Sequence, residues 1–344
     1  MLLIIAHHYV VNSGLWGVLE ENPCTTKTIF LWLFGAFGKT GINCFVLITG
    51  YFMCTSRITS RKFFKLLFEV YFYRIIIYTI FCFTGYETVS WMRIVKQFIP
   101  FISLSNDFTA CFLAFFLTIP FLTALVQHID KKTHFRLVVL IFALFVCFAS
   151  VPFFSISFSY VAWFIALFFI ASYIRLYPLA IYANTKLWGW LSLAFLVLDC
   201  LSVLFSLKFG WGQYFWIADS NKILAVLTSI VWFLLFKNIR IKQSKIINLF
   251  GGATFGVLLI HANSDAMRAW LWRDFLKNAE VYGNGNMIYW HSILSVLGVF
   301  VVCAIIDIIR QKTIEKPFLD WFDKLWNKIS VKLETLEERI LKIK

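Results

Sequence analysis

The segment "IIAHHYVVNSG", residues 4–14, places two adjacent histidines inside an apolar run. Imidazole takes up and returns a proton near neutral pH, so a histidine in such a run is a candidate general base. Asn12 follows His8 by four residues, and residues four apart share one face of a helix. His7 points about 100° away from that face. We predict that His8 and Asn12 are catalytic, the alternative for His8 being a ring held by a backbone carbonyl.

A second group of polar residues repeats at i, i+4 and i+7 near the end of another apolar run: His261, Asp265 and Arg268. This spacing predicts one helical face. Ionisable residues at membrane depth are costly and usually functional, so we expect a second site here, toward the outer surface. The alternative for His261, as for His8, is a ring held by a backbone carbonyl. Four further polar residues in apolar runs are predicted to be structural, each pairing with another helix: Asn43, Glu69, Arg74 and Asp199.

The composition requires a membrane. Hydrophobic residues make up 60% of the 344 residues and charged residues 15%, whereas soluble domains carry about 25% charged residues. Apolar runs long enough to cross a bilayer recur along the chain. We predict an all-α integral membrane protein with about ten transmembrane helices in one bundle and a cytoplasmic amphipathic C-terminal helix. The predicted spans are 1–19, 38–54, 63–84, 106–127, 134–151, 158–177, 187–207, 222–237, 246–263 and 288–309. The short segment 27–37 is predicted to be an interfacial or re-entrant helix.

The charge distribution predicts the orientation. One set of loops carries twice as many Lys and Arg residues as the opposite set, which places it and both termini in the cytoplasm. The net charge of +14 is therefore attributed to topology and membrane lipid rather than to nucleic acid. No CxxC pair or other metal-ligand spacing occurs, so we expect no metal. The non-cytoplasmic loops 85–105, 208–221 and 264–287 are rich in aromatic residues, which indicates an interfacial belt or a surface for stacking sugars.

The last segment differs from the rest of the chain. Its apolar residues recur three and four apart, with Lys and Glu between them. This pattern predicts an amphipathic helix on the membrane surface, or a coiled coil with a partner. The predicted division is a transmembrane domain at 1–312 and a cytoplasmic helical tail at 313–344.

Four segments in this order resemble the acyltransferase-3 family of bacterial multi-span enzymes that O-acylate cell-surface glycans. They are "IIAHHYVVNSG", then "GKTGINCFVLITGYF" at 38–52, "WFIALFFIASYIRLYP" at 163–178 and "TFGVLLIHANSDAMRAWLWRD" at 254–274. His8 matches the essential histidine of the family. An arginine that precedes this histidine in the family would lie upstream of Met1, which predicts either a start further upstream or a truncated copy.

The resemblance implies a transmembrane acyltransferase domain at 1–312, located in the bacterial cytoplasmic membrane. No bound cofactor is expected; the donor would be acyl-CoA, with acetyl-CoA expected, and the acceptor a glycan hydroxyl. His8 would take the hydroxyl proton or carry the acyl group, and Asn12 would donate to the oxyanion. His261, Asp265 and Arg268 become acceptor-side candidates. The donor-binding candidates are basic loop residues that could hold the CoA phosphates: Arg57, Arg61, Arg175 and Arg240.

Two other readings stay open at this point. Intramembrane His and Asp residues also mark ion pathways, so a polytopic transporter or flippase is one alternative. The missing arginine supports an inactive acyltransferase-like subunit as the other. The sequence leaves the glycan, its hydroxyl, the acyl chain and the oligomeric state undetermined.

Overall fold

A computed structural model describes residues 1–99, 101, 104, 107–151, 154, 158–210 and 212–341. Of the predicted segments, positions 100, 102, 103, 105, 106, 211 and 342–344 lie outside the described residues. The chain is 80% helical, with no strand in the described part, which confirms the all-α class. The α-helices are α1 (Leu2–Val11), α2 (Leu15–Glu21), α3 (Thr26–Gly35), α4 (Gly38–Met53), α5 (Ser60–Phe83), α6 (Trp91–Phe98), α7 (Phe108–His128), α8 (Lys131–Ile141), α9 (Tyr160–Leu176), α10 (Thr185–Phe209), α11 (Ile223–Asn238), α12 (Lys245–Gly252), α13 (Thr254–His261), α14 (Asp265–Ala269), α15 (Asn278–Gly283), α16 (Met287–Arg310) and α17 (Lys316–Leu341).

The helices form a bundle suited to several membrane crossings. In the described residues, six helices are long and apolar enough to cross a membrane, and a seventh span results if α1 and α2 are counted as one bent pair. The helices α9 and α11 are apolar but shorter. The chain is therefore a multi-pass membrane protein by its helices, and the count of ten spans stays a prediction.

Three predicted elements have different limits in the structure. Most of the segment 27–37 forms the short helix α3, which leads into α4, and the two helices together make one candidate span, Thr26–Met53. The predicted span 1–19 is two helices that meet at 66°. Gly14 lies between them at φ +78°, a conformation that glycine adopts readily. The predicted span 246–263 is likewise divided, at Ala253.

Small residues let α4 approach its neighbours at the centre of the bundle. A Cβ atom on Gly38 would lie 2.4 Å from Cβ of His7, and one on Gly50 would lie 3.0 Å from Cβ of Ala171. Any side chain at Gly38 would thus displace α1. The close helix contact predicted around Asn43 is confirmed, and it sets the position of the first histidine of the chain.

The four polar residues predicted to be structural each contact another element. The Asn43 amide donates to the Ser220 carbonyl at 2.7 Å and accepts from the Trp163 indole at 2.9 Å. Arg74 lies 4.0 Å from Asp107, the N-cap of α7. The remaining pairs are Asp199 with Thr228 at 2.8 Å and Glu69 with Arg310 at 3.2 Å.

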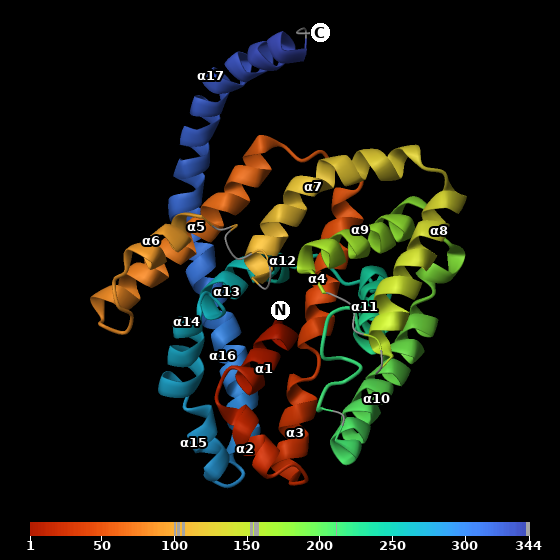
Figure 1. Ribbon diagram of the computed structural model, residues 1–344, viewed down its shortest axis with the longest axis vertical. Helices are drawn as coiled ribbons and strands as arrows, with labels where there is room; N and C mark the ends of the chain where they lie inside the picture. The colour runs from red at the N-terminus through yellow and green to blue at the C-terminus, as the bar shows by residue number, and fades with distance from the viewer. Residues whose placement is uncertain are drawn as a thin grey trace.

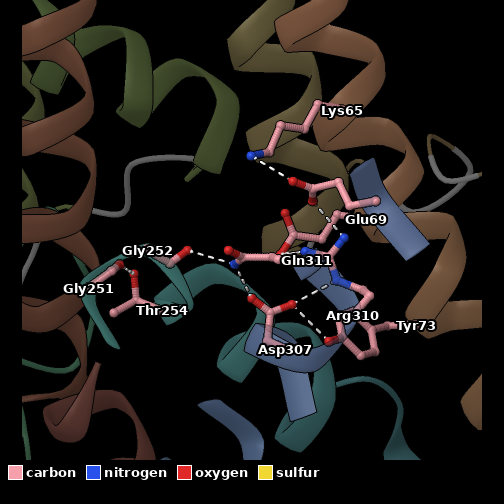
Figure 2. Close-up of polar contacts among 10 residues, drawn as sticks. Lys65, Glu69, Tyr73, Gly251, Gly252, Thr254, Asp307, Arg310 and Gln311 are labelled. Carbon is pink, nitrogen blue, oxygen red and sulfur yellow. Dashed lines mark hydrogen bonds and ion pairs between the residues drawn. The ribbon is translucent and has the colours of Figure 1, made fainter. Parts of the chain in front are cut away.

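Arg310 is the centre of a buried ionic cluster (Figure 2), which we call the Arg310 cluster. Its guanidinium contacts Asp307 at 2.8 Å, Glu315 at 2.7 Å and Glu69. A π-helical turn over Gln311–Glu315 carries the chain from α16 into α17 and brings Glu315 back to Arg310. The other members are Tyr73 and Gln311, which donate to Asp307 at 2.8 and 2.7 Å, and Lys65, which lies 2.8 Å from Glu315.

The C-terminal helix α17 begins on the bundle and then leaves it. Phe318 stacks on Phe68 of α5 with ring centroids 3.9 Å apart, and Asp323 pairs with Arg61 at 3.0 Å. Figure 1 shows α17 projecting from the end of the molecule opposite to α2 and α15. Its position in the cytoplasm and on the membrane surface stays a prediction.

Candidate functional site

The helices α1 and α13 bring two histidines together across 253 positions of sequence. Nδ1 of His8 lies 3.1 Å from Nε2 of His261, and the ring centroids are 5.2 Å apart. His261 is the last residue of α13. The two residues that the sequence assigned to separate sites therefore form one histidine pair.

The partners of the pair determine where its protons lie. Nδ1 of His261 is 2.6 Å from the Val257 carbonyl, and a carbonyl only accepts, so this Nδ1 carries a hydrogen. In a neutral ring the Nε2 of His261 is then an acceptor, and the His8 Nδ1 donates to it. The remaining nitrogen, Nε2 of His8, keeps its lone pair. The arrangement therefore presents His8 as a base with a fixed tautomer.

Burial distinguishes the two rings. His261 is completely buried, whereas His8 is partly exposed. The position of α1 is fixed on its other side by Tyr9, whose hydroxyl is hydrogen-bonded to His291 at 2.8 Å. Asn278 donates to the Tyr9 carbonyl at 3.0 Å. His8 is thus the accessible member of a rigidly positioned pair.

His7 has a different environment from His8, as its place on the helix predicts. Its Nδ1 donates to the Gly35 carbonyl at 2.7 Å, and its ring centroid lies 6.1 Å from that of His8. The ring lines a cavity of about 490 Å³, together with Trp16, Lys39, Tyr214, Asp219 and Lys222. We call this space the Lys39 cavity.

Asn12 lies at the end of α1. It is the C-cap, and its backbone N–H donates to the His8 carbonyl at 3.0 Å. In the part of the chain that the structure describes, its side-chain amide has no hydrogen-bond partner. The amide is therefore not committed to the fold, and its predicted catalytic role stays a prediction.

The expectation of one helical face for His261, Asp265 and Arg268 is wrong. The helix ends at His261, and Ser264 begins α14 by accepting a hydrogen bond from the Met267 N–H. The Asp265 side chain is 98% exposed and pairs with Arg268. Because the Val257 carbonyl holds His261, Asp265 does not orient that ring.

A hydrogen bond beside this region raises the pKa of a tyrosine. The Tyr86 hydroxyl, beyond the end of α5, donates to Asp274 at 2.5 Å. This hydrogen bond raises the pKa of Tyr86 to about 12, so the phenol stays protonated at neutral pH. The contact ties the loop after α5 to the π-helical turn Trp270–Phe275.

A second cavity of about 500 Å³ lies between α1, α4 and α11, and we call it the Tyr51 cavity. Ile4 lines it one helical turn before His8, and Tyr51 and Lys237 line it near the ends of α4 and α11. Two cavities therefore adjoin α1, one beside Ile4 and one beside His7.

The four donor-binding candidates differ in their contacts. Arg175 donates to the Tyr51 hydroxyl at 3.1 Å and lies over its ring, which places it at the Tyr51 cavity. Arg61 is engaged by Asp323. Arg57 and Arg240 are exposed. Lys237, which the sequence reading did not single out, lies 5.9 Å from the Tyr51 ring and is a further cation here.

The comparison with protein families decides the class. The model described as "Acyltransferase domain" matches residues 1–308, most of the chain. The chain belongs to the acyltransferase-3 family. The resemblance seen in four sequence segments is thereby confirmed. No curated protein and no solved structure gives a significant match to this acyltransferase.

Family membership places the histidine pair within the acyltransferase domain. The matched residues include His8, His261 and both cavities, whereas α17 lies beyond them. Three features of the site were missed in the sequence. The Val257 carbonyl gives no sequence signal, and Tyr51 resembles any interfacial tyrosine. Lys39 did give a sequence signal that was overlooked, because it is a charged residue in a predicted apolar span.

Proposed function

We propose that this chain is a membrane-bound O-acyltransferase that moves an acyl group, with acetyl as the expected group, from acyl-CoA to a hydroxyl of a cell-surface polysaccharide or lipid-linked glycan. The observation that carries the proposal is the chain of hydrogen bonds from the Val257 carbonyl through His261 to His8. It leaves one basic nitrogen, on an accessible ring, in a protein of an acyltransferase family.

The chemistry uses that nitrogen directly. Nε2 of His8 removes the proton of the sugar hydroxyl as the oxygen attacks the thioester carbonyl carbon. The C–O bond forms and the C–S bond breaks, which yields the ester and the CoA thiolate. The imidazolium then returns its proton to the thiolate. The Asn12 amide, which has no other partner in the described part, is proposed to donate to the tetrahedral oxyanion.

The two cavities provide separate approaches for two substrates. The Tyr51 cavity carries Lys237 and adjoins Arg175, and cations there suit the phosphates of CoA. The Lys39 cavity carries polar and aromatic side chains, which suit a sugar. We propose that the donor enters from the cytoplasm through the first and the acceptor from the outer side through the second. Both cavities reach α1, the first at Ile4, one helical turn before His8, and the second at His7.

Turnover of radiolabelled acetyl-CoA by the purified full chain in lipid vesicles tests the activity. We expect slow hydrolysis without acceptor and faster transfer when an acceptor glycan is supplied. A transporter would leave acetyl-CoA intact, and so would an inactive subunit. Complete stability of acetyl-CoA with every acceptor would refute the proposal.

Cysteine labelling tests the proposed entry sides. In intact cells, a membrane-impermeant reagent should label Lys277→Cys but not Ser60→Cys. The reverse pattern would place the Tyr51 cavity outside and contradict the donor assignment.

A further inference from the structure

Two lysines line the Lys39 cavity from different elements. Lys39 lies in the first turn of α4, inside the candidate span Thr26–Met53, and Lys222 is the N-cap of α11. Both side chains are partly buried. A charged group within a membrane span is costly, and such groups usually have a functional reason.

Neither lysine is neutralised by a carboxylate. Nζ of Lys39 donates to the Tyr160 hydroxyl at 2.8 Å, and Nζ of Lys222 donates to the Ala149 carbonyl at 2.5 Å. Both acceptors are uncharged, and an ammonium has three N–H donors. In the described residues neither lysine forms an ion pair. Both therefore have further N–H donors for a ligand.

The acidic residues nearby lie in more exposed positions. Asp219 lines the same cavity but is exposed, and Glu20 is exposed and accepts from Trp16 and Gln213. Water and salt screen exposed charges more strongly than partly buried ones. Among the charged residues that line the cavity, the two lysines are therefore less screened than Asp219.

Hydrogen bonds to neighbouring elements hold the walls of the cavity in place. The Asn43 amide fixes the Ser220 carbonyl, and the Tyr214 hydroxyl donates to the Trp32 carbonyl at 2.9 Å. Trp16 and Tyr214 place their rings 6.1 Å apart and nearly perpendicular. A fixed cavity that combines flat apolar faces with cations suits a sugar that carries a negative charge.

We propose that the Lys39 cavity binds an anionic sugar, with Lys39 and Lys222 contacting an oxyanion on it. The oxyanion is a carboxylate, as in a uronic acid, or a phosphate. Calling this sugar the acyl acceptor rests on the proposed function; the binding of an anion does not. His7 lines the cavity and adjoins His8, so a sugar bound there lies next to the helix that carries the base.

Calorimetric titration of the purified full chain tests the site without relying on catalysis. The probes are a galacturonic acid trisaccharide, the same trisaccharide reduced to galactose, and glucose 1-phosphate. We expect the charged probes to bind more tightly than the reduced one, and added salt to weaken only the charged probes. Preference between carboxylate and phosphate identifies the source of the oxyanion.

Substitutions assign the binding to the two lysines. Lys39→Gln and Lys222→Gln should each weaken the preferred charged probe about tenfold and leave the reduced trisaccharide unchanged. Lys208→Gln is the matched control, because Lys208 precedes the same loop but does not line the cavity. If one variant fails to fold by gel filtration, the other decides.

Equal binding of the charged and reduced probes, or no binding of either, would overturn this inference, as would unchanged affinity in both variants. Charge-selective binding without any acetyl-CoA turnover would refute the proposed function and leave the anion site standing. Acyl transfer that does not depend on acceptor charge and is unchanged in both variants would refute the anion site and leave the proposed function standing.

Discussion

The histidine pair and the Arg310 cluster are both groups of polar side chains between helices, yet they differ in what they leave unused. In the Arg310 cluster one cation is surrounded by three carboxylates, and Tyr73, Gln311 and Lys65 bind two of these. In the histidine pair, His8 donates to His261, and His261 donates to the Val257 carbonyl. Nε2 of His8 belongs to neither hydrogen bond and keeps its lone pair. A network in which each charged group is paired with an opposite charge stabilises a fold, whereas one that leaves a free lone pair is prepared for chemistry.

The largest effect on activity should come from removing His8, whose Nε2 keeps a free lone pair. His8→Ala should lower acyl transfer about 10²–10⁴-fold, because it removes the nitrogen proposed to take the hydroxyl proton. The fold should persist, since the Arg310 cluster is untouched. His7→Ala, the control on the adjacent residue, should lower turnover less than tenfold. The measurement follows label from acetyl-CoA in membranes with matched protein levels. An active His8→Ala variant beside an inactive His7→Ala would reverse the assignment.

The next effect should appear in stability rather than activity. Arg310→Ala leaves Glu69, Asp307 and Glu315 buried without their shared cation, which typically costs about 3–5 kcal/mol. We expect a much lower unfolding temperature in detergent, or loss of the monodisperse protein. Arg61→Ala is the control, because its partner Asp323 is exposed and such pairs contribute about 0–1 kcal/mol. Equal melting of both variants would show that the Arg310 cluster is not structural.

A smaller effect on activity should follow from His261. His261→Ala removes the acceptor that fixes the His8 tautomer, and we expect turnover to fall about ten- to a hundredfold. His261→Gln should recover part of the loss, because its amide oxygen can accept from Nδ1 of His8. The double variant His8→Ala, His261→Ala should be no worse than His8→Ala alone. An additive double loss would mean that His261 acts on the substrate independently.

The smallest effect should come from Asp265. Asp265→Asn breaks an exposed pair with Arg268 that contributes about 0–1 kcal/mol, so transfer should stay within about twofold of the wild type. The same assay measures it. A loss as large as that of His261→Ala would restore the idea that Asp265 supports the pair.

Hydropathy predicted the all-α membrane class, because a segment that crosses a bilayer must satisfy its backbone hydrogen bonds internally and must be apolar over its whole length. It failed where local geometry decides. A glycine at φ +78° divides the first span, and α3 and α4 together form a candidate span that 27–37 alone is too short to make. Neither is visible in a hydropathy average.

Sequence spacing predicted the site in part. It identified both His8 and His261, since each is a rare polar residue in an apolar run. It could not place them together, because spacing describes neighbours on one helix and says nothing of contacts between distant helices. For the same reason it grouped Asp265 with His261, although a helix break separates them. It also ranked Arg57 and Arg240 with Arg175, while only packing shows which arginine meets Tyr51.

The contact between His8 and His261 joins residues separated by 253 positions, and this has a consequence for how the protein is made. At about 5–20 residues per second, the ribosome needs roughly ten to fifty seconds to synthesise the chain between them. Until α13 enters the membrane, His8 has no partner to fix its proton. Under the proposed function, a nascent chain that already exposes its first helix is therefore a poor consumer of cellular thioesters, and full activity arises only when synthesis is nearly complete.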